Sequence, residues 1–483
     1  MRRAIIVAIL ISFVIKGFGQ QASVDIDRND LKSIVRILSS DSLKGRGIDN
    51  GGHRKAGDFI SQTFKNLGLI TINENSYFEE FELKQKYWGQ VYIHSPISKL
   101  NNFENMVFQG SDVQNEEVEK EIVFGGLGSE EELNRIDVTD RFVLIFIDNL
   151  RAGIKFKKQL AKRNAFGVIL ANPENDKQFE QIRLTLKDHY LAKRYALIDE
   201  KIQQDKRAAW DTIQYVNSIL IPNDQIQKIS GLSISQLSRL IEQKRIEEAP
   251  ISKVKAKFEK VEKNITTANV GGLLQGKSNK TIVITAHYDH LGVVNNQIFS
   301  GADDNASGTA ALLELAQKFS QSNDLLYNIL FLATSAEEVG LLGSKYHVNN
   351  VSFESDNIIC NLNLDMISRK DNKHFNNKYL YCIGSDQNEN LHQLMLRADN
   401  AYKKCEFDYS LNNSQDPSGI FTRSDNYSFY KKGIPSIFFF TGLHTDYHKS
   451  TDTANKINFK RLEYRVKLIS EVLELLARDG LKN

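Results

Sequence analysis

Downstream of Asn264, hydrophobic residues gather in short continuous runs rather than in an alternating pattern. Five of these runs have the length of a strand: residues 281–286, 328–334, 357–364, 379–384 and 435–442. Strands buried on both faces have this composition, because helices cover both sides of their sheet. Helical periodicity lies between and after the runs, at residues 308–319, 341–348 and 459–477. The pattern predicts an α/β fold with a mixed, mostly parallel sheet flanked by helices.

The first part of the chain has a different pattern. Residues 31–69 contain two helical stretches separated by the turn-rich sequence KGRGIDNGG. From about Tyr87 to Ile251, short β-rich pieces precede a long, heavily charged stretch, which predicts an inserted module with a small core of its own. The Lys/Glu-rich residues 241–263 are expected to be a solvated surface and linker.

We therefore divide the chain into four segments. Residues 1–20 form a signal peptide, residues 21–86 the N-terminal part of the main domain, residues 87–260 a smaller β-rich insertion, and residues 261–483 the rest of the main domain. The first segment has two arginines, an apolar run of about 11 residues and small residues near its end, which is the layout of a secretory signal. The run is short for a membrane span, which needs about 20 apolar residues. We expect a secreted or periplasmic protein with no integral membrane span after removal of the signal; an N-terminal anchor helix is the alternative.

Composition and charge argue against nucleic acid as a partner and against one kind of metal site. The 483 residues include 62 Lys+Arg and 60 Asp+Glu, giving a formal net charge of +2, so there is no electrostatic reason to expect nucleic acid as a partner. The three cysteines, Cys360, Cys382 and Cys405, contain no CxxC spacing, which excludes a thiolate zinc site. Oligomeric state cannot be deduced.

Polar residues follow the predicted strands at the points where those strands end. The segments concerned contain His287 and Asp289, Asp303 and Asp304, Glu337 and Glu338, Asp365, and His448. In an α/β sheet such strand ends meet at one edge, where ligands bind. Any one of these residues alone is more simply explained as a helix cap or a solvated side chain. Together, imidazole and carboxylate without thiolate suit zinc in an open catalytic site.

These segments resemble the co-catalytic di-zinc aminopeptidases of metallopeptidase family 28. The motifs HYDHLG, GADDNASGTAALLELA, ATSAEEVGLLGS, NLDMIS and DYHKSTDT occur in the family's order over roughly residues 264–458, with no departure at a ligand position. Residues 31–69 resemble the family's N-terminal piece. The fold implied is that of the zinc exopeptidases (phosphorylase/hydrolase-like). The insertion resembles, more loosely, a protease-associated (PA) domain.

The resemblance implies a role for each site residue. Two Zn²⁺ ions would be held, one by His287, Asp304 and Asp365 and the other by Asp304, Glu338 and His448. A cis peptide is implied between Asp304 and Asn305. Asp289 would orient His287, Glu337 would act as general base on a water shared by the metals, and Tyr447 would steady the oxyanion. The implied reaction is hydrolysis of N-terminal bonds in peptides or proteins with a free N-terminus.

Several alternatives remain open at this point. A carboxypeptidase or dipeptidase would use the same motifs, a glutaminyl cyclase would use one zinc, and a binding homologue would keep the fold without catalysis. His290, His347, His392 and His444 are expected to be packing or surface residues. Residues 271–278 also satisfy the phosphate-loop pattern GxxxxGKS. A strand follows them where a phosphate loop needs a helix, so we interpret them as a turn.

Overall fold

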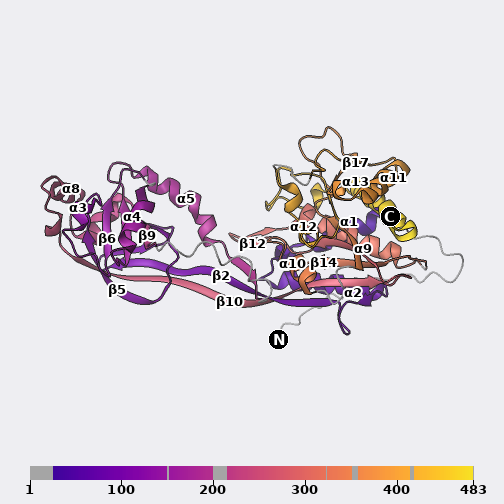
Figure 1. The fold of residues 1–483 in the computed structure, drawn as a ribbon, viewed down its shortest axis with the longest axis horizontal. Coiled ribbons are helices and arrows are strands. Elements are labelled where there is room, and N and C mark those ends of the chain that lie inside the picture. The colour runs from indigo at the N-terminus through magenta and orange to yellow at the C-terminus, as the bar shows by residue number, and fades with distance from the viewer. Residues whose placement is uncertain are drawn as a thin grey trace, which may run out of the picture. The chain divides into compact units, whose positions relative to one another are not determined.

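The computed structural model describes residues 25–149, 152–198, 215–322, 324–350, 357–413 and 418–481; the predicted signal peptide lies outside them. The chain divides into two units (Figure 1): unit 1 comprises Met1–Glu80 and Ala268–Asn483, and unit 2 comprises Phe81–Thr267. The predicted boundaries at 86/87 and 260/261 fall inside strands β2 (Phe78–Ser95) and β10 (Ser252–Leu274). Within the described residues, no helix combines the length and the hydropathy that a bilayer crossing requires.

The sheet of unit 1 confirms the predicted fold class. Its strand order is β17–β16–β18–β15–β11–β14–β10, with β1 (Ile70–Thr71) also paired to β10. The strands are β11 (Thr281–His287), β14 (Asn328–Thr334), β15 (Ile358–Leu364), β16 (Tyr379–Ile383), β17 (Glu406–Asp408) and β18 (Ser436–Phe440). Strand β11 is parallel to β14 and β15, and β15 is parallel to β18, whereas β16 runs antiparallel to β18. The sheet is therefore mixed and mostly parallel.

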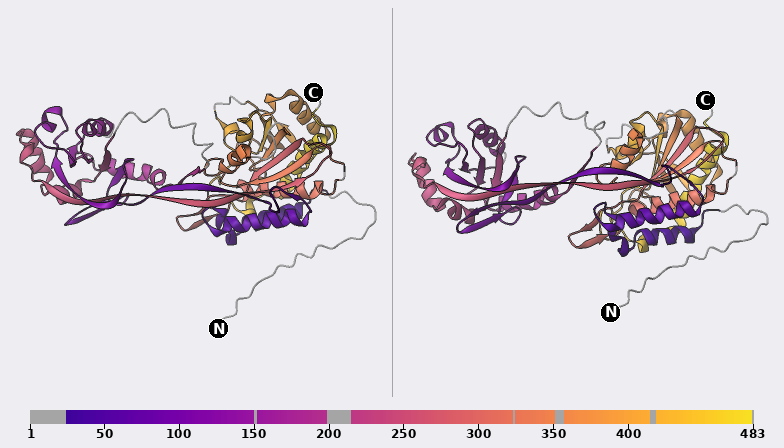
Figure 2. Two further views of the ribbon diagram at one scale, coloured as in Figure 1. Left: turned by 60° about the horizontal axis from the view of Figure 1, so that its bottom comes forward. Right: turned by 90° about the horizontal axis from the view of Figure 1, so that it is seen from below.

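Helices cover both faces of this sheet. One face packs against α1 (Arg28–Leu38), α2 (Gly51–Asn66), α9 (Gly308–Phe319), α11 (Glu389–Ala401) and α13 (Phe459–Asp479). Figure 2 shows α1 and α2 in indigo on the same side of the sheet. The other face carries α10 (Leu342–Asn350) and α12 (Asn426–Tyr430). Strand β11 contributes to the apolar core on each face of the sheet. Ile282 and Ile284 pack on the face covered by α1, α2, α9, α11 and α13, and Val283 packs on the face that carries α10 and α12.

Unit 2 contains further strands and two apolar clusters of its own. Strands β5 (Gln114–Phe124), β6 (Phe142–Phe146), β7 (Gly167–Ala171) and β9 (Asn217–Leu220) are parallel, and β4 (Val107–Gln109) pairs antiparallel with β9. Strand β2 pairs with β3 (Ser98–Asn101) and β8 (Arg194–Leu197). The helices are α3 (Glu130–Leu133), α4 (Ala152–Ala161), α5 (Lys177–Leu191), α7 (Asn223–Ser230) and α8 (Ile234–Glu242).

One expectation for this region is wrong. Residues 241–263 were expected to be a solvated linker, but from Ser252 onward they form the first half of the 23-residue strand β10. Val254, Ala256 and Phe258 are buried in the core of unit 2. They alternate with lysines, so one face of the strand is apolar and the other is charged.

Candidate metal centre

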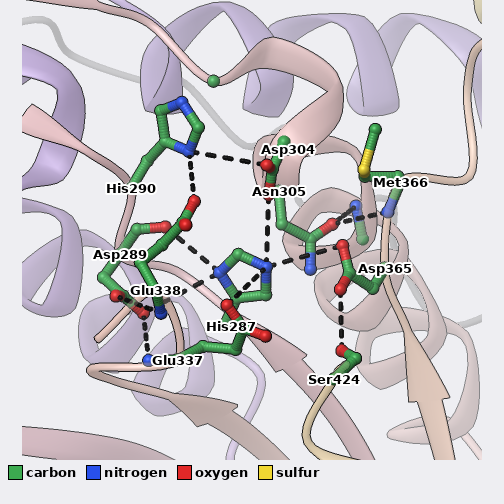
Figure 3. Close-up of polar contacts among 12 residues, drawn as sticks. His287, Asp289, His290, Asp304, Asn305, Glu337, Glu338, Asp365, Met366 and Ser424 are labelled. Carbon is green, nitrogen blue, oxygen red and sulfur yellow. Dashed lines mark hydrogen bonds and ion pairs between the residues drawn. The ribbon is translucent and has the colours of Figure 1, made fainter. Parts of the chain in front are cut away.

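The strand ends of unit 1 bring the predicted site residues together (Figure 3). His287 is the last residue of β11, Asp365 follows β15 directly, and Glu337 and Glu338 lie in the loop after β14. Asp304 lies in the helical turn Ala302–Ser307, which leads into α9. Because β11, β14 and β15 are adjacent and parallel, their carboxyl ends share one edge of the sheet.

The carboxylate of Asp304 stands between two groups of side chains. Its Oδ1 lies 3.4 Å from His287 Nε2, which is itself 3.5 Å from Asp365 Oδ1. Its Oδ2 lies 3.2 Å from His448 Nε2, which is itself 3.1 Å from Glu338 Oε2. Each oxygen of one carboxylate therefore faces a different group. The peptide bond between Asp304 and Asn305 is cis, as the resemblance implied.

The donor atoms of both groups suit a divalent metal. His287, Asp304 and Asp365 present donors within 4.8 Å of one another, as do His290, Asp304 and Glu338, so this second set contains His290 where the resemblance implied His448. Two ligands of a tetrahedral zinc ion, each about 2.0–2.1 Å from it, lie about 3.3–3.4 Å apart. The distances from His287 Nε2 to Asp304 Oδ1, 3.4 Å, and to Asp365 Oδ1, 3.5 Å, are close to this value. Asp365 Oδ1 is also buried without a hydrogen-bond donor among the described residues. These residues therefore fit the zinc that the sequence predicts.

Asp289 lies beside His287 but contacts it differently from the prediction. The carboxylate is 3.8 Å from His287 Nδ1, and the backbone carbonyl of Asp289 is closer, at 3.2 Å. The carboxylate instead accepts the backbone N–H groups of Glu337, at 3.1 Å, and of Glu338, at 3.3 Å. Asp289 thus fixes the loop that carries these two glutamates, in addition to its carbonyl contact with His287.

Glu337 and Tyr447 line the same cavity. Its walls are formed by charged site residues and by apolar side chains: Asp304, Glu337, Asp365, Met366, Ile420, Arg423, Phe438, Phe440, Leu443, Tyr447 and His448. The Tyr447 ring stacks on His448 with centroids 3.8 Å apart, and its hydroxyl accepts a hydrogen bond of 3.2 Å from Arg423 Nη2. The structure thus brings together all eight residues that the sequence predicted for the site.

Burial and the density of carboxylates shift the pKa values of these groups in the metal-free protein. Burial raises the pKa of Glu337 well above its usual range; the charge of His287 opposes this, and the charges of Glu338 and Asp365 reinforce it. Burial disfavours the charged form of His448, but its hydrogen bonds to Asp304 and Glu338 raise its pKa to about 10. Burial and the charge of Asp304 raise the pKa of Tyr447, so its hydroxyl is protonated at neutral pH and can donate a hydrogen bond.

Sequence reasoning missed several residues of this centre. His290 and His444 were expected to be packing or surface residues, yet His290 Nδ1 lies 2.7 Å from Glu338 Oε1 and His444 Nε2 lies 3.2 Å from Asp303 Oδ2. Ser424 donates a hydrogen bond of 2.7 Å to Asp365 Oδ2. The two histidines lie in segments that also carry predicted ligands, and that position is a usable signal. The sequence gives no such signal for Ser424, because its segment follows no predicted strand.

Part of this chain matches known proteins. Residues 269–473 match peptidase family M28. Aminopeptidase YwaD of Bacillus subtilis (strain 168) is 32% identical over 217 residues, which cover 43% of this chain and 44% of that protein. BOS complex subunit NCLN of Canis lupus familiaris is 28% identical over 220 residues, which cover 41% and 38%. The chain therefore spans less than half the length of these relatives.

Similarity in three dimensions extends over nearly the whole chain. The solved structure of BSAP, a zinc aminopeptidase from Bacillus subtilis, aligns with 95% of this chain and 97% of its own, with a TM-score of 0.53 and 17% identity. At that identity the likeness establishes a shared fold and no more.

Proposed function

Since residues 269–473 belong to peptidase family M28, we propose that the whole chain is a zinc-dependent aminopeptidase that removes N-terminal residues from peptides. The observation that carries the proposal is the position of Asp304, whose two carboxylate oxygens face His287 on one side and His448 on the other. A carboxylate placed in this way could be shared by a pair of metal ions, which supports a two-metal site. A metal pair in a cavity with apolar walls is suited to peptide hydrolysis.

Family membership implies zinc, and we infer two ions for each chain. His287, Asp304 and Asp365 would hold one, and Asp304, Glu338 and His448 would hold the other. When bound, zinc would lower the pKa of a water molecule and polarise the scissile carbonyl. The ring nitrogen of His448 must be free of its proton to bind metal, so its raised pKa predicts proton release on zinc binding.

Glu337 is the proposed general base. Its Oε2 lies 3.9 Å from His287 Nε2, close to the metal group but outside both ligand sets. The carboxylate would take a proton from the attacking water and pass that proton to the leaving amine. Asp289 holds the backbone of Glu337 and thereby directs this carboxylate toward the cavity. A raised pKa suits a group that must both accept and donate the proton.

Tyr447 is the proposed donor to the oxyanion. Arg423 donates a hydrogen bond to the Tyr447 oxygen, which leaves the hydroxyl proton free to point into the cavity. A hydroxyl placed there would stabilise negative charge as it develops on the carbonyl oxygen.

The proposal extends to the cellular location of the protein and to the nature of unit 2. We propose that residues 1–20 direct export and that unit 2 is a PA-like domain. The parallel strands β5, β6, β7 and β9 give that unit a core independent of the metal centre. N-terminal sequencing of the mature protein from extracellular or periplasmic fractions tests the export prediction, with cleavage expected near residue 20.

The central experiment combines zinc analysis with hydrolysis of aminoacyl anilides by three purified proteins: wild type, Glu337→Gln and Glu314→Gln. Glu314 is the control, because it is a glutamate of unit 1 that is buried in α9 and does not line the cavity. We expect about two zinc ions per chain in all three proteins. We expect kcat to fall at least about 10²-fold in Glu337→Gln alone.

Other outcomes would contradict the proposal. A wild-type protein that binds zinc but cyclises N-terminal glutamine instead of hydrolysing anilides would be a cyclase. One that binds zinc and performs neither reaction would be a binding homologue. Equal losses of activity in Glu337→Gln and Glu314→Gln would remove Glu337 from its proposed role.

A further inference from the structure

A tight turn in the N-terminal segment lies against the loops of the metal centre. Lys44, Gly45 and Arg46 all have positive φ angles, of 46°, 64° and 53°. A side chain at Gly45 would place its Cβ 2.3 Å from the carbonyl oxygen of Phe299 and 2.5 Å from that of Gly292. The close approach therefore requires glycine. Phe299 and Gly292 belong to the hairpin of β12 (Gly292–Val294) and β13 (Gln297–Phe299), which links the His287 and Asp304 segments.

The side chain of Arg46 is fully buried, with 0% exposure, and all of its N–H groups have acceptors. Every acceptor is a backbone carbonyl. Nε donates to Tyr288 at 2.8 Å, Nη1 donates to Leu38 at 2.6 Å and Ser300 at 2.8 Å, and Nη2 donates to Gly301 at 2.9 Å and Asp304 at 3.5 Å. A guanidinium has five N–H donors in a rigid, planar fork. All five N–H donors of the Arg46 guanidinium are therefore engaged in hydrogen bonds.

The carbonyls come from segments far apart in the sequence. Tyr288 lies between His287 and Asp289 on one ligand segment, while Ser300, Gly301 and Asp304 form the other. Leu38 is the last residue of α1, and the backbone N–H of His290 donates back to the Arg46 carbonyl at 3.3 Å. One planar group thus sets the distance between the backbone that carries His287 and the backbone that carries Asp304.

Arg46 also supplies charge where carboxylates are crowded. No carboxylate of the described chain forms an ion pair with it at contact distance, yet Asp304, Asp289, Asp452 and Glu338 all lie near enough to interact with its charge. Buried carboxylates repel one another strongly unless a cation compensates them. The guanidinium offsets part of this repulsion.

We propose that Arg46 is a positioning residue that assembles the metal centre before metal binds, so that the N-terminal segment is part of the centre although it lies outside residues 269–473. The proposal rests on the proposed zinc site. Lysine cannot replace this function, because an ammonium has three donors around a single point and cannot span the separated carbonyls.

A second buried arginine provides a matched control. Arg465 in α13 is also 0% exposed and also donates only to backbone carbonyls, those of Tyr379, Ile367, Arg369 and Asn377. Its acceptors lie on residues 367–379, from the loop after β15 to the first residue of β16, and none of its hydrogen bonds within the described residues reaches the His287 or the Asp304 segment. Loss of Arg465 should therefore reduce stability without changing the separation of those two segments.

The experiment measures zinc affinity in the full-length mature protein, stripped of metal and titrated with Zn²⁺ against a chromogenic chelator. The variants are Arg46→Lys, Arg46→Met and Arg465→Lys. We expect zinc affinity to fall at least about tenfold in both Arg46 variants and to stay at the wild-type value in Arg465→Lys. We also expect a lower thermal midpoint of the metal-free protein in Arg46→Met than in Arg46→Lys, because only lysine keeps the charge.

The outcomes separate this inference from the proposed function. A wild-type chain that binds no zinc overturns both. A wild-type chain that binds zinc, with Arg46→Lys binding it equally well at the wild-type kcat, overturns the role of Arg46 alone. An equal loss of affinity in Arg465→Lys also overturns that role, because the loss would then reflect general stability. Should Arg46→Met fail to fold, Arg46→Lys decides the question.

Discussion

The carboxyl group of Glu314 makes the stability of unit 1 depend on pH. This residue lies in α9 with 2% of its surface exposed, and its Oε2 accepts the backbone N–H of Asp27 at 3.1 Å. Its Oε1 has no hydrogen-bond donor among the described residues. Burial, together with the nearby charges of Asp30 and Asp27, raises the pKa of Glu314 from 4.5 to about 7, although the hydrogen bond from Asp27 opposes the shift.

The sign of the effect follows from the direction of the shift. Between pH 4.5 and pH 7 the folded protein keeps a proton on Glu314 that the unfolded chain has released, so stability falls as the pH rises through this window. Each pKa unit corresponds to about 1.4 kcal/mol. Compared with a side chain that stays neutral in both states, Glu314 lowers the free energy of unfolding by about 1 kcal/mol at pH 5, where only the unfolded chain is ionised, and by about 3 kcal/mol at pH 8.

Glu314→Gln removes the charge and keeps an acceptor for the Asp27 N–H. We expect this variant to be more stable than wild type, with an advantage that grows by about 2 kcal/mol between pH 5 and pH 8. Urea unfolding of the zinc-saturated proteins at both pH values measures the difference. Comparison at the same pH cancels the pH dependence of zinc binding, and Glu74→Gln at an exposed position controls for net charge. An advantage of equal size at both pH values would refute the reasoning.

Three further predictions concern the metal centre and its support. Ser424→Ala removes the hydrogen bond to Asp365 and the acceptor of Asn363 Nδ2, and it should weaken zinc binding about tenfold in chelator competition. Gly45→Ala, which would place its Cβ against the Phe299 carbonyl, should destabilise the protein by at least about 2 kcal/mol in urea; a wild-type midpoint would contradict the tight packing of that turn. Removal of metal by a chelator should lower the thermal midpoint, and added zinc should restore it; with zinc at about 100 times its Kd, the difference corresponds to about 2.7 kcal/mol.

The strands and the site of unit 1 could be predicted because one physical rule governs both. Strands buried on two faces give apolar runs such as residues 281–286 and 328–334, and a polar residue directly after such a run is conspicuous. His287 and Asp365 were identified in that way, and Glu338 was identified in the loop that follows residues 328–334. Their roles came from the resemblance, because the sequence order of strand ends does not reveal which side chains meet.

Other features left no readable local pattern. Arg46 is bound by carbonyls that lie 242 to 258 residues away, apart from that of Leu38, so no window of sequence around it indicates its role. Strand β10 does have a signal, because Val254, Ala256 and Phe258 alternate with polar residues. The lysines between them dominate the composition of the segment and concealed that alternation.

Because Asp304 faces both clusters, substitutions in the site differ in how much of it they alter. A substitution at Asp365 or His448 alters one cluster and leaves the donors of the other in place, whereas a substitution at Asp304 removes a donor from both. Divergence of related sequences can therefore alter one cluster at a time, provided that this single aspartate is kept.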